Sequence, residues 1–122
     1  MTDGVQAQLR ALPSLAVIDL QGDLTASSRD AMLAAYQEAS RLEPSDVLLN
    51  FARVTYINSG GISAVVGLLI ETRRAGQRLA VTGLNPHYLK VFQMMGLSQH
   101  ARVFDTEAEA QAFAVAQRAS AG

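Results

Sequence analysis

Two patterns of apolar and polar residues near the start of the chain each predict a strand. The first is an alternation, and the second is a nearly continuous apolar run. From Val5 to Ala11 every second residue is apolar, which is typical of a strand with one face in solvent. Pro13 and Ser14 interrupt this pattern, and the more continuously apolar run Leu15–Leu20 predicts a buried strand. Because the connection between the two runs is tight, they are expected to form an antiparallel hairpin.

Further along the chain, apolar residues recur at the i, i+3, i+4, i+7 spacing of amphipathic helices, and short apolar runs separate them. Asn85-Pro86 and the Thr106–Glu109 capping box are helix starts, and Ser27 with Asp30 predicts another. Gly76 and Gly96 are helix stops. The buried helical positions are expected to be Met32, Ala35, Tyr36 and Ala39, then Ile62, Val65, Val66, Leu69 and Ile70, then Tyr88, Val91, Phe92 and Met95. The remaining strands are expected at 46–51, 78–82 and 102–104.

The resulting order is β-β-α-β-α-β-α-β-α, which predicts one α/β domain over residues 1–122. Strands separated by crossover helices pair in parallel. The expected sheet is therefore mixed and mostly parallel, with an antiparallel edge strand at 5–11 and about four flanking helices. The last helix is expected at about 106–118, with Ala110, Phe113 and Ala114 facing inward.

Composition narrows the class of protein. The chain has 122 residues, 49% of them hydrophobic, which suits one small globular core. The net charge of −1 does not favour nucleic acid or an anionic membrane as a partner. No apolar run approaches the length of a membrane span, and no basic segment followed by an apolar one opens the chain. A cytoplasmic protein without direct membrane contact is expected.

Residues that would carry catalysis are sparse. The absence of cysteine excludes disulfides, thiolate metal sites and cysteine nucleophiles. Gly60-Gly61 lacks the lysine of a nucleotide-binding P-loop, and His87 and His100 have no ligand partner at metal-binding spacing. Ser59 has neither a G-x-S-x-G context nor an assignable base. We therefore expect no enzyme activity, no metal and no cofactor.

The segment YINSGGIS, Tyr56–Ser63, joins a predicted strand to the following helix. Asn58 or Ser59 can cap the helix by accepting a hydrogen bond from a free amide, which contributes about 1 kcal/mol. Gly60 and Gly61 would allow backbone angles or a close approach that a β-carbon forbids. Capping alone is one interpretation of this segment.

Two features of the same helix indicate a surface for a partner. Glycine costs about 1 kcal/mol relative to alanine inside a helix, and less near its ends. The helix is also apolar beyond its predicted inner stripe, because Ala64, Gly67 and Leu68 fall away from the face centred on Val66. We expect them to form a flat, weakly polar surface beside an exposed Ser59. Such a patch next to a modifiable hydroxyl suits a protein interface controlled by charge.

Three stretches together resemble the STAS domain, the fold of bacterial anti-sigma-factor antagonists. They are VIDLQGDLTASS, VLLNFARVTYINSGGISAVVGLL and AVTGLNPHYLKVFQMMGL, and the similarity extends from Leu15 to about Phe113. The first resembles the family's strand followed by G-[ED]-L-[DT], and the second its D-S-[ST]-G-[LI] helix start.

The resemblance implies partner switching in the regulation of transcription. An unmodified antagonist binds an anti-sigma factor, usually also a serine kinase of the histidine-kinase-like ATPase type, and so frees a sigma factor. The kinase phosphorylates the D-S-[ST]-G segment and a phosphatase reverses this. The added charge of roughly −1.5 to −2 would expel the partner through repulsion and desolvation.

The chain departs from the family pattern at the phosphorylation site. The family's aspartate falls on Asn58, its first serine on Ser59 and its usual phosphoacceptor on Gly60, whereas Gly61 and Ile62 match. Glycine has no hydroxyl, so three explanations stand. The protein docks constitutively or is regulated by other means, which we favour; Ser59 is the acceptor one position early; or the segment is a small-ligand or anion site built from helix amides.

The first function hypothesis is therefore an anti-sigma-factor-antagonist-type interaction module. The alternative is a STAS-like ligand-sensing or transport-accessory subunit. The predicted partner contacts lie on the turn, the strand-to-helix segment and the outer helix face: Asp23, Leu24, Thr25, Asn58, Ser59, Gly60, Gly61, Ser63, Ala64, Gly67 and Leu68.

Overall fold

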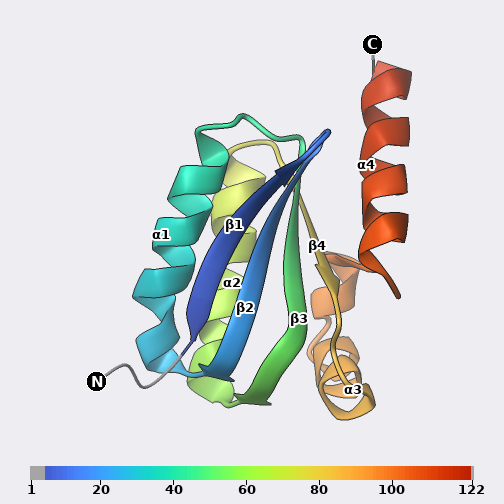
Figure 1. Cartoon of the computed structure of the whole chain (residues 1–122). Coiled ribbons are helices and arrows are strands. Elements are labelled where there is room, and N and C mark those ends of the chain that lie inside the picture. The colour runs from blue at the N-terminus through green and yellow to red at the C-terminus, as the bar shows by residue number, and fades with distance from the viewer. Residues whose placement is uncertain (1–4, 122) are drawn as a thin grey trace.

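The computed structural model describes residues 5–121, which form a five-stranded sheet with helices on both faces (Figure 1). The strands are β1 (Gln6–Leu12), β2 (Leu15–Leu24), β3 (Asp46–Ile57), β4 (Arg78–Thr82) and β5 (Arg102–Val103). The helices are α1 (Arg29–Ser40), α2 (Ser59–Arg74), α3 (Pro86–Met94) and α4 (Glu107–Ala121), with 3-10 turns η1 (Ala26–Ser28) and η2 (Leu97–Gln99).

The strands lie side by side in the order β1-β2-β3-β4-β5. β1 pairs antiparallel with β2, and the three other pairings are parallel. The predicted mixed sheet with an antiparallel edge strand is confirmed. Because β3 and β4 are parallel neighbours, the helices that follow them, α2 and α3, both begin at the same end of the sheet.

One face of the sheet carries the main core. Apolar side chains of β2 and β3, such as Ile18, Leu49 and Phe51, pack against α1, α2 and α3. Phe51 meets Phe92 of α3 edge to face, with ring centroids 5.9 Å apart. Burial of this face fixes α2 and α3 relative to the ends of the strands that precede them.

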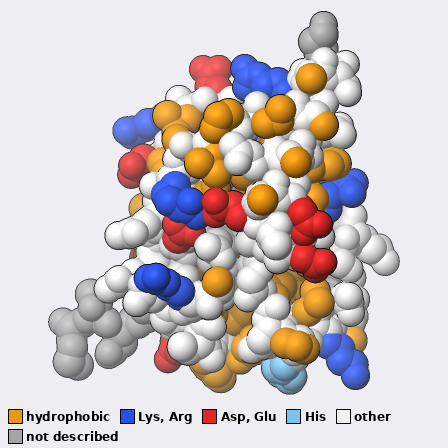
Figure 2. Space-filling model, turned by 45° about the vertical axis from the view of Figure 1, so that its right-hand side comes forward, with side chains coloured by type: hydrophobic (Ala, Val, Ile, Leu, Met, Phe, Trp, Pro, Cys, Tyr) orange, Lys and Arg blue, Asp and Glu red, His pale blue; other side chains and the backbone are white. Residues whose placement is uncertain are grey.

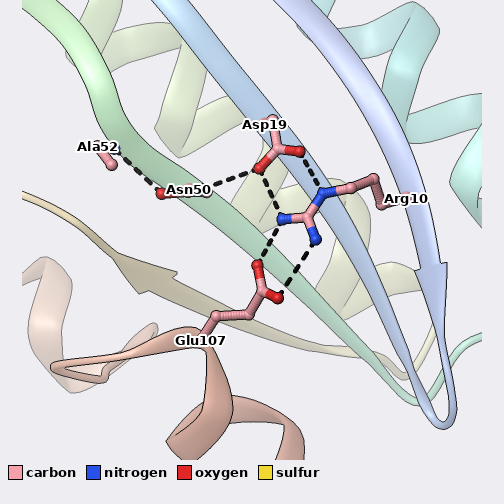
Figure 3. Close-up of polar contacts among 5 residues, drawn as sticks. All are labelled: Arg10, Asp19, Asn50, Ala52 and Glu107. Atoms are coloured by element: carbon pink, nitrogen blue, oxygen red, sulfur yellow. Dashed lines mark hydrogen bonds and ion pairs between the residues drawn. The ribbon is translucent and has the colours of Figure 1, made fainter.

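The other face is covered by α4 over a smaller cluster, in which Ala110 and Ala114 contact side chains of β2, β3 and β4. A polar network fastens the start of this helix to the sheet (Figure 3). Arg10 on β1 donates to both Asp19 on β2 and Glu107 on α4, and Asn50 Nδ2 donates to Asp19 at 2.9 Å. This network links the first strand of the chain to its last helix.

Several predicted helix boundaries are confirmed by local geometry. Asn85 caps α3 by accepting from Tyr88 N at 2.9 Å, with Pro86 at the first helical position. Thr106 and Glu109 form the predicted capping box at α4. Gly76 and Gly96 follow helices with φ of 72° and 75°, which favours glycine.

Other boundaries differ from the prediction. β2 continues to Leu24 and β3 to Ile57, beyond the predicted strands at 15–20 and 46–51. The reason is that the two strands stay paired past the end of their apolar runs. Ser27 does not cap α1. Thr25 and Ser28 form a capping box around η1, and α1 begins only at Arg29.

Candidate functional site

The strand-to-helix corner at Asn58 is held by two hydrogen bonds to different segments. Asn58 has an extended backbone, and its Oδ1 accepts from Gly61 N at 3.0 Å, so it is the N-cap of α2. Its own N–H donates to Leu24 O at 3.1 Å, at the end of β2. The predicted cap is therefore Asn58, and Ser59 is left at the first helical position with an exposed side chain.

The turn after β2 lies against this corner and has its own hydrogen bonds. Thr55 on β3 donates through Oγ1 to Asp23 Oδ1 at 2.7 Å, which orients an exposed carboxylate. Thr25 N donates to Ser28 Oγ at 2.9 Å, and Ser28 Oγ donates to Asp23 O at 3.2 Å. The turn and the start of α2 thus form one structured unit.

The two glycines of the corner are required by close approach. A β-carbon at Gly61 would lie 2.2 Å from Leu24 O, and one at Gly60 would lie 2.6 Å from Ala26 N. Both distances are far below van der Waals contact, and Gly60 and Gly61 have ordinary helical placement. Asn-Ser-Gly-Gly therefore lets the turn lie directly on the first turn of α2.

The structure brings most of the predicted contact residues together on the surface. Asp23, Ser59 and Ser63 are exposed, and the half-buried members are Thr25, Asn58, Gly60 and Gly67. The expected surface position is wrong for four of the predicted contact residues, which are buried: Leu24, Gly61, Ala64 and Leu68. Leu24 has no exposed area and lies in the main core.

The error at Ala64 and Leu68 has a simple cause. Their exposed fractions are 5% and 3%, because α2 is buried against α1 as well as against the sheet. The buried face of α2 is accordingly wider than predicted and rotated, so that Ile70, expected inside, is 47% exposed. The true outer face runs through Ser59, Ser63 and Val66.

A groove between α2 and α3 adjoins this outer face and was not predicted. It has a volume of about 510 Å³ and is lined by Ile57, Asn58, Ser59, Ile62, Ser63, Val66, His87, Tyr88, Val91 and Met95. Tyr88 Oη accepts a hydrogen bond from Ile57 N at 3.1 Å, which ties α3 to the end of β3. Tyr88, Val91 and Met95 were predicted to be buried. Their apolar stripe instead extends past the core, and Met95 is 55% exposed.

We define the docking surface as this outer face with its groove and the adjoining turn: Asp23, Thr25, Asn58, Ser59, Gly60, Ser63, Val66, Gly67, His87 and Met95. It combines an apolar groove, exposed hydroxyls and one oriented carboxylate. Such a mixture is typical of protein interfaces.

Acidic and basic side chains are interspersed over the face shown in Figure 2. Within residues 5–121, no group of three or more histidine, aspartate or glutamate side chains could hold a metal ion. In the same part of the chain no helix is both long and apolar enough to cross a membrane.

The sheet order and the capped corner define the class of fold: a mixed α/β sheet of the kind seen in anti-sigma-factor antagonists. Residues 7–104 match the family described as the Mlab, STAS domain, so the chain belongs to the STAS domain family. The resemblance read from the sequence is confirmed.

Solved structures agree with this assignment. The Bacillus cell-fate determinant SpoIIAA in its phosphorylated form is 27% identical, with a TM-score of 0.65 over 85% of this chain and 95% of that one. An anti-sigma factor antagonist from Mycobacterium paratuberculosis is 13% identical, with a TM-score of 0.78 over 93% and 97%. A sulfate transporter family protein from Wolinella succinogenes is 19% identical, with a TM-score of 0.73 over 86% and 88%.

Proposed function

We propose that this protein is an anti-sigma-factor-antagonist-type regulator that binds a kinase-like anti-sigma factor through the docking surface. The observation that carries the proposal is the corner itself. Asn58 and the neighbouring turn are held by hydrogen bonds, yet Ser59 and Asp23 are exposed. A rigid, exposed surface lowers the entropy cost of binding a protein partner.

The groove between α2 and α3 strengthens the case for a macromolecular partner. Ile62 and Tyr88 form part of its walls, and Met95 stands at its side with more than half of its surface exposed. Burying such apolar side chains under a partner is favourable, and flexible methionine adapts to the partner's shape. This surface replaces the Ala64 and Leu68 face suggested by the helical pattern.

We infer that docking is not regulated by phosphorylation at the family's usual position, which is Gly60 in this chain. Gly60 has no hydroxyl, and the place of a side chain there is taken by Ala26. A serine introduced at Gly60 would have to displace the turn, whose atoms lie within 3.0 Å of the added β-carbon. Regulation would then act through other means, such as supply of the protein.

Ser59 is the alternative acceptor. Its hydroxyl is exposed at the first position of α2, on the docking surface, so a phosphate there would add charge to the interface. Incubation with the cognate kinase and ATP, followed by mass spectrometry, decides between the two. Unmodified protein that still binds the kinase supports constitutive docking, whereas phosphate on Ser59 refutes it.

A second candidate function is a ligand-sensing or transport-accessory subunit, whose partner would be a transport complex rather than a kinase. The likeness to a sulfate transporter family protein and the presence of a groove favour it. In this case a small molecule, or an anion at the first amides of α2, would raise the melting temperature. Recovery of a kinase-like partner, with no ligand that raises the melting temperature, would support the first proposal. Under that proposal a phosphatase is a further expected partner.

A further inference from the structure

The two edges of the sheet differ in how they are protected. At one edge, β5 has two residues and pairs only with Ala80 and Val81 of β4. The chain after β5 stays bound to β4, because Phe104 N donates to Val81 O at 2.9 Å, and Phe104 packs against Phe113 of α4. Such a short edge offers little backbone to another chain.

The opposite edge is β1, a strand of seven residues. On its inner side every residue pairs with β2 in an uninterrupted register from Gln6–Gln21 to Leu12–Leu15. Among residues 5–121, no other segment donates to or accepts from the β1 backbone. Because antiparallel residues alternate, every second N–H and C=O of β1 points away from β2 and lacks a protein partner.

β1 also lacks several of the features that discourage pairing at a sheet edge. It contains no proline, no lysine and no bulge against β2. Its one charge, Arg10, is directed along the sheet face to Asp19 and Glu107 (Figure 3). The edge is therefore long, regular and without a free charge of its own.

We propose that β1 pairs antiparallel with β1 of a second copy of this chain, so that one sheet continues through both copies. The sequence of the strand is self-complementary when the two-fold axis passes through Leu9, since all seven residues then find a partner. Gln8 faces Arg10 of the second copy, Ala7 faces Ala11, and Leu9 faces Leu9. No like charges stand opposite each other in this arrangement.

This inference does not depend on the proposed function, because it uses neither α2 nor the groove. The docking surface lies on the turn after β2, the corner after β3, and α2 and α3, whereas the proposed contact is the outer edge of β1 centred on Leu9 (Figure 1). If partner binding is not observed, the proposed dimer is unaffected. If the dimer is not observed, the proposed partner binding is unaffected.

Analytical ultracentrifugation of the full chain up to about 1 mM tests the pairing, since weak dimers form in that range. The wild type should show a concentration-dependent dimer. Gln8→Arg places two arginines opposite each other twice per dimer and should weaken it roughly tenfold, whereas Gln8→Glu should strengthen it. Gln21→Arg is the matched control, because Gln21 lies on β2, one strand in from the edge, and its dimer constant should stay unchanged.

Hydrogen exchange locates the contact. Amides of β1 should exchange more slowly at high concentration than at low concentration, while those of β5 should not change. A protein that stays monomeric at about 1 mM would overturn the proposal. Equal dimer dissociation constants for Gln8→Arg and Gln8→Glu would also overturn it. So would concentration-dependent protection of amides that lie outside β1.

Discussion

Gly60 and Gly67 both belong to α2, yet only Gly60 is pressed against another part of the chain. A β-carbon at Gly60 would meet Ala26, whereas one at Gly67 would meet nothing within 4 Å. We expect Gly67→Ala to raise the free energy of unfolding by up to about 1 kcal/mol through helix propensity. Gly60→Ala should lower it by about 1–3 kcal/mol because the turn must shift.

Urea denaturation of the two variants makes this comparison, since both carry the same substitution in the same helix. Equal stabilisation by Gly60→Ala and Gly67→Ala would contradict the close contact between the turn and α2. It would also remove the reason for which we consider Gly60 unable to accommodate a phosphoacceptor.

Asn58 supplies the hydrogen bond that starts α2, and its loss should be measurable. Asn58→Ala removes the acceptor for Gly61 N and should cost about 1 kcal/mol of unfolding free energy. Asn58→Asp keeps an acceptor and adds negative charge at a helix N-terminus, so stability should be unchanged or higher. Thermal denaturation monitored by circular dichroism ranks the three proteins, and an Asp variant as unstable as the Ala variant would refute the cap.

Residue-scale features were predictable where they depend on neighbours in the sequence. The caps at Asn85 and Thr106 and the stop at Gly96 follow from local hydrogen bonds and backbone angles. The contact between Gly60 and Ala26 joins two segments brought together only by the pairing of β2 with β3. No local pattern contains that information.

At the scale of elements, α4 is fastened to the sheet by a network that depends on pH. The hydrogen bond from Arg10 holds the pKa of Asp19 below its ordinary value of 3.8, although partial burial opposes this. Because the pKa is lowered in the folded state, the network stabilises the fold above that ordinary value. The contribution is lost as the pH falls below it.

Arg10→Gln should therefore lower the unfolding free energy at pH 7 by up to about 1 kcal/mol, as expected for partly exposed ion pairs. The deficit relative to the wild type should shrink as the pH is lowered below about 4. Arg41→Gln, at the exposed end of α1, is the control and should shift stability equally at both pH values. A deficit for Arg10→Gln that does not change with pH would contradict the role given to Asp19.

The helical period of α2 was predictable, but its orientation was not. Apolar residues surround most of this helix, so the pattern alone left the choice of inner face open. α2 packs against α1 through Ala64 and Leu68 and against the sheet through residues such as Val65. A helix that packs against two partners buries a wider face than a helix that packs against one. The sequence of α2 does not show how many partners the helix has, because that depends on the tertiary structure.

At the scale of the whole molecule, the directions of the strands followed from the alternation of strand and helix patterns, whereas their order across the sheet was not predicted. The groove was not predicted either, because α2 and α3 approach each other only after β3 and β4 have paired. The sequence thus predicted the corner between β3 and α2 but not the groove beside it. The corner, the groove and the turn are now a single candidate site.

The most direct test of the docking surface is the affinity for the cognate kinase-like anti-sigma factor, measured by calorimetry with two matched variants. Ser63→Arg places a bulky charge beside the groove, and Ser98→Arg places the same group on η2, outside the docking surface; both serines are exposed. We predict that Ser63→Arg weakens binding at least about tenfold while Ser98→Arg leaves it unchanged. Equal affinity for both folded variants would contradict the claim that this protein binds its partner through the start of α2.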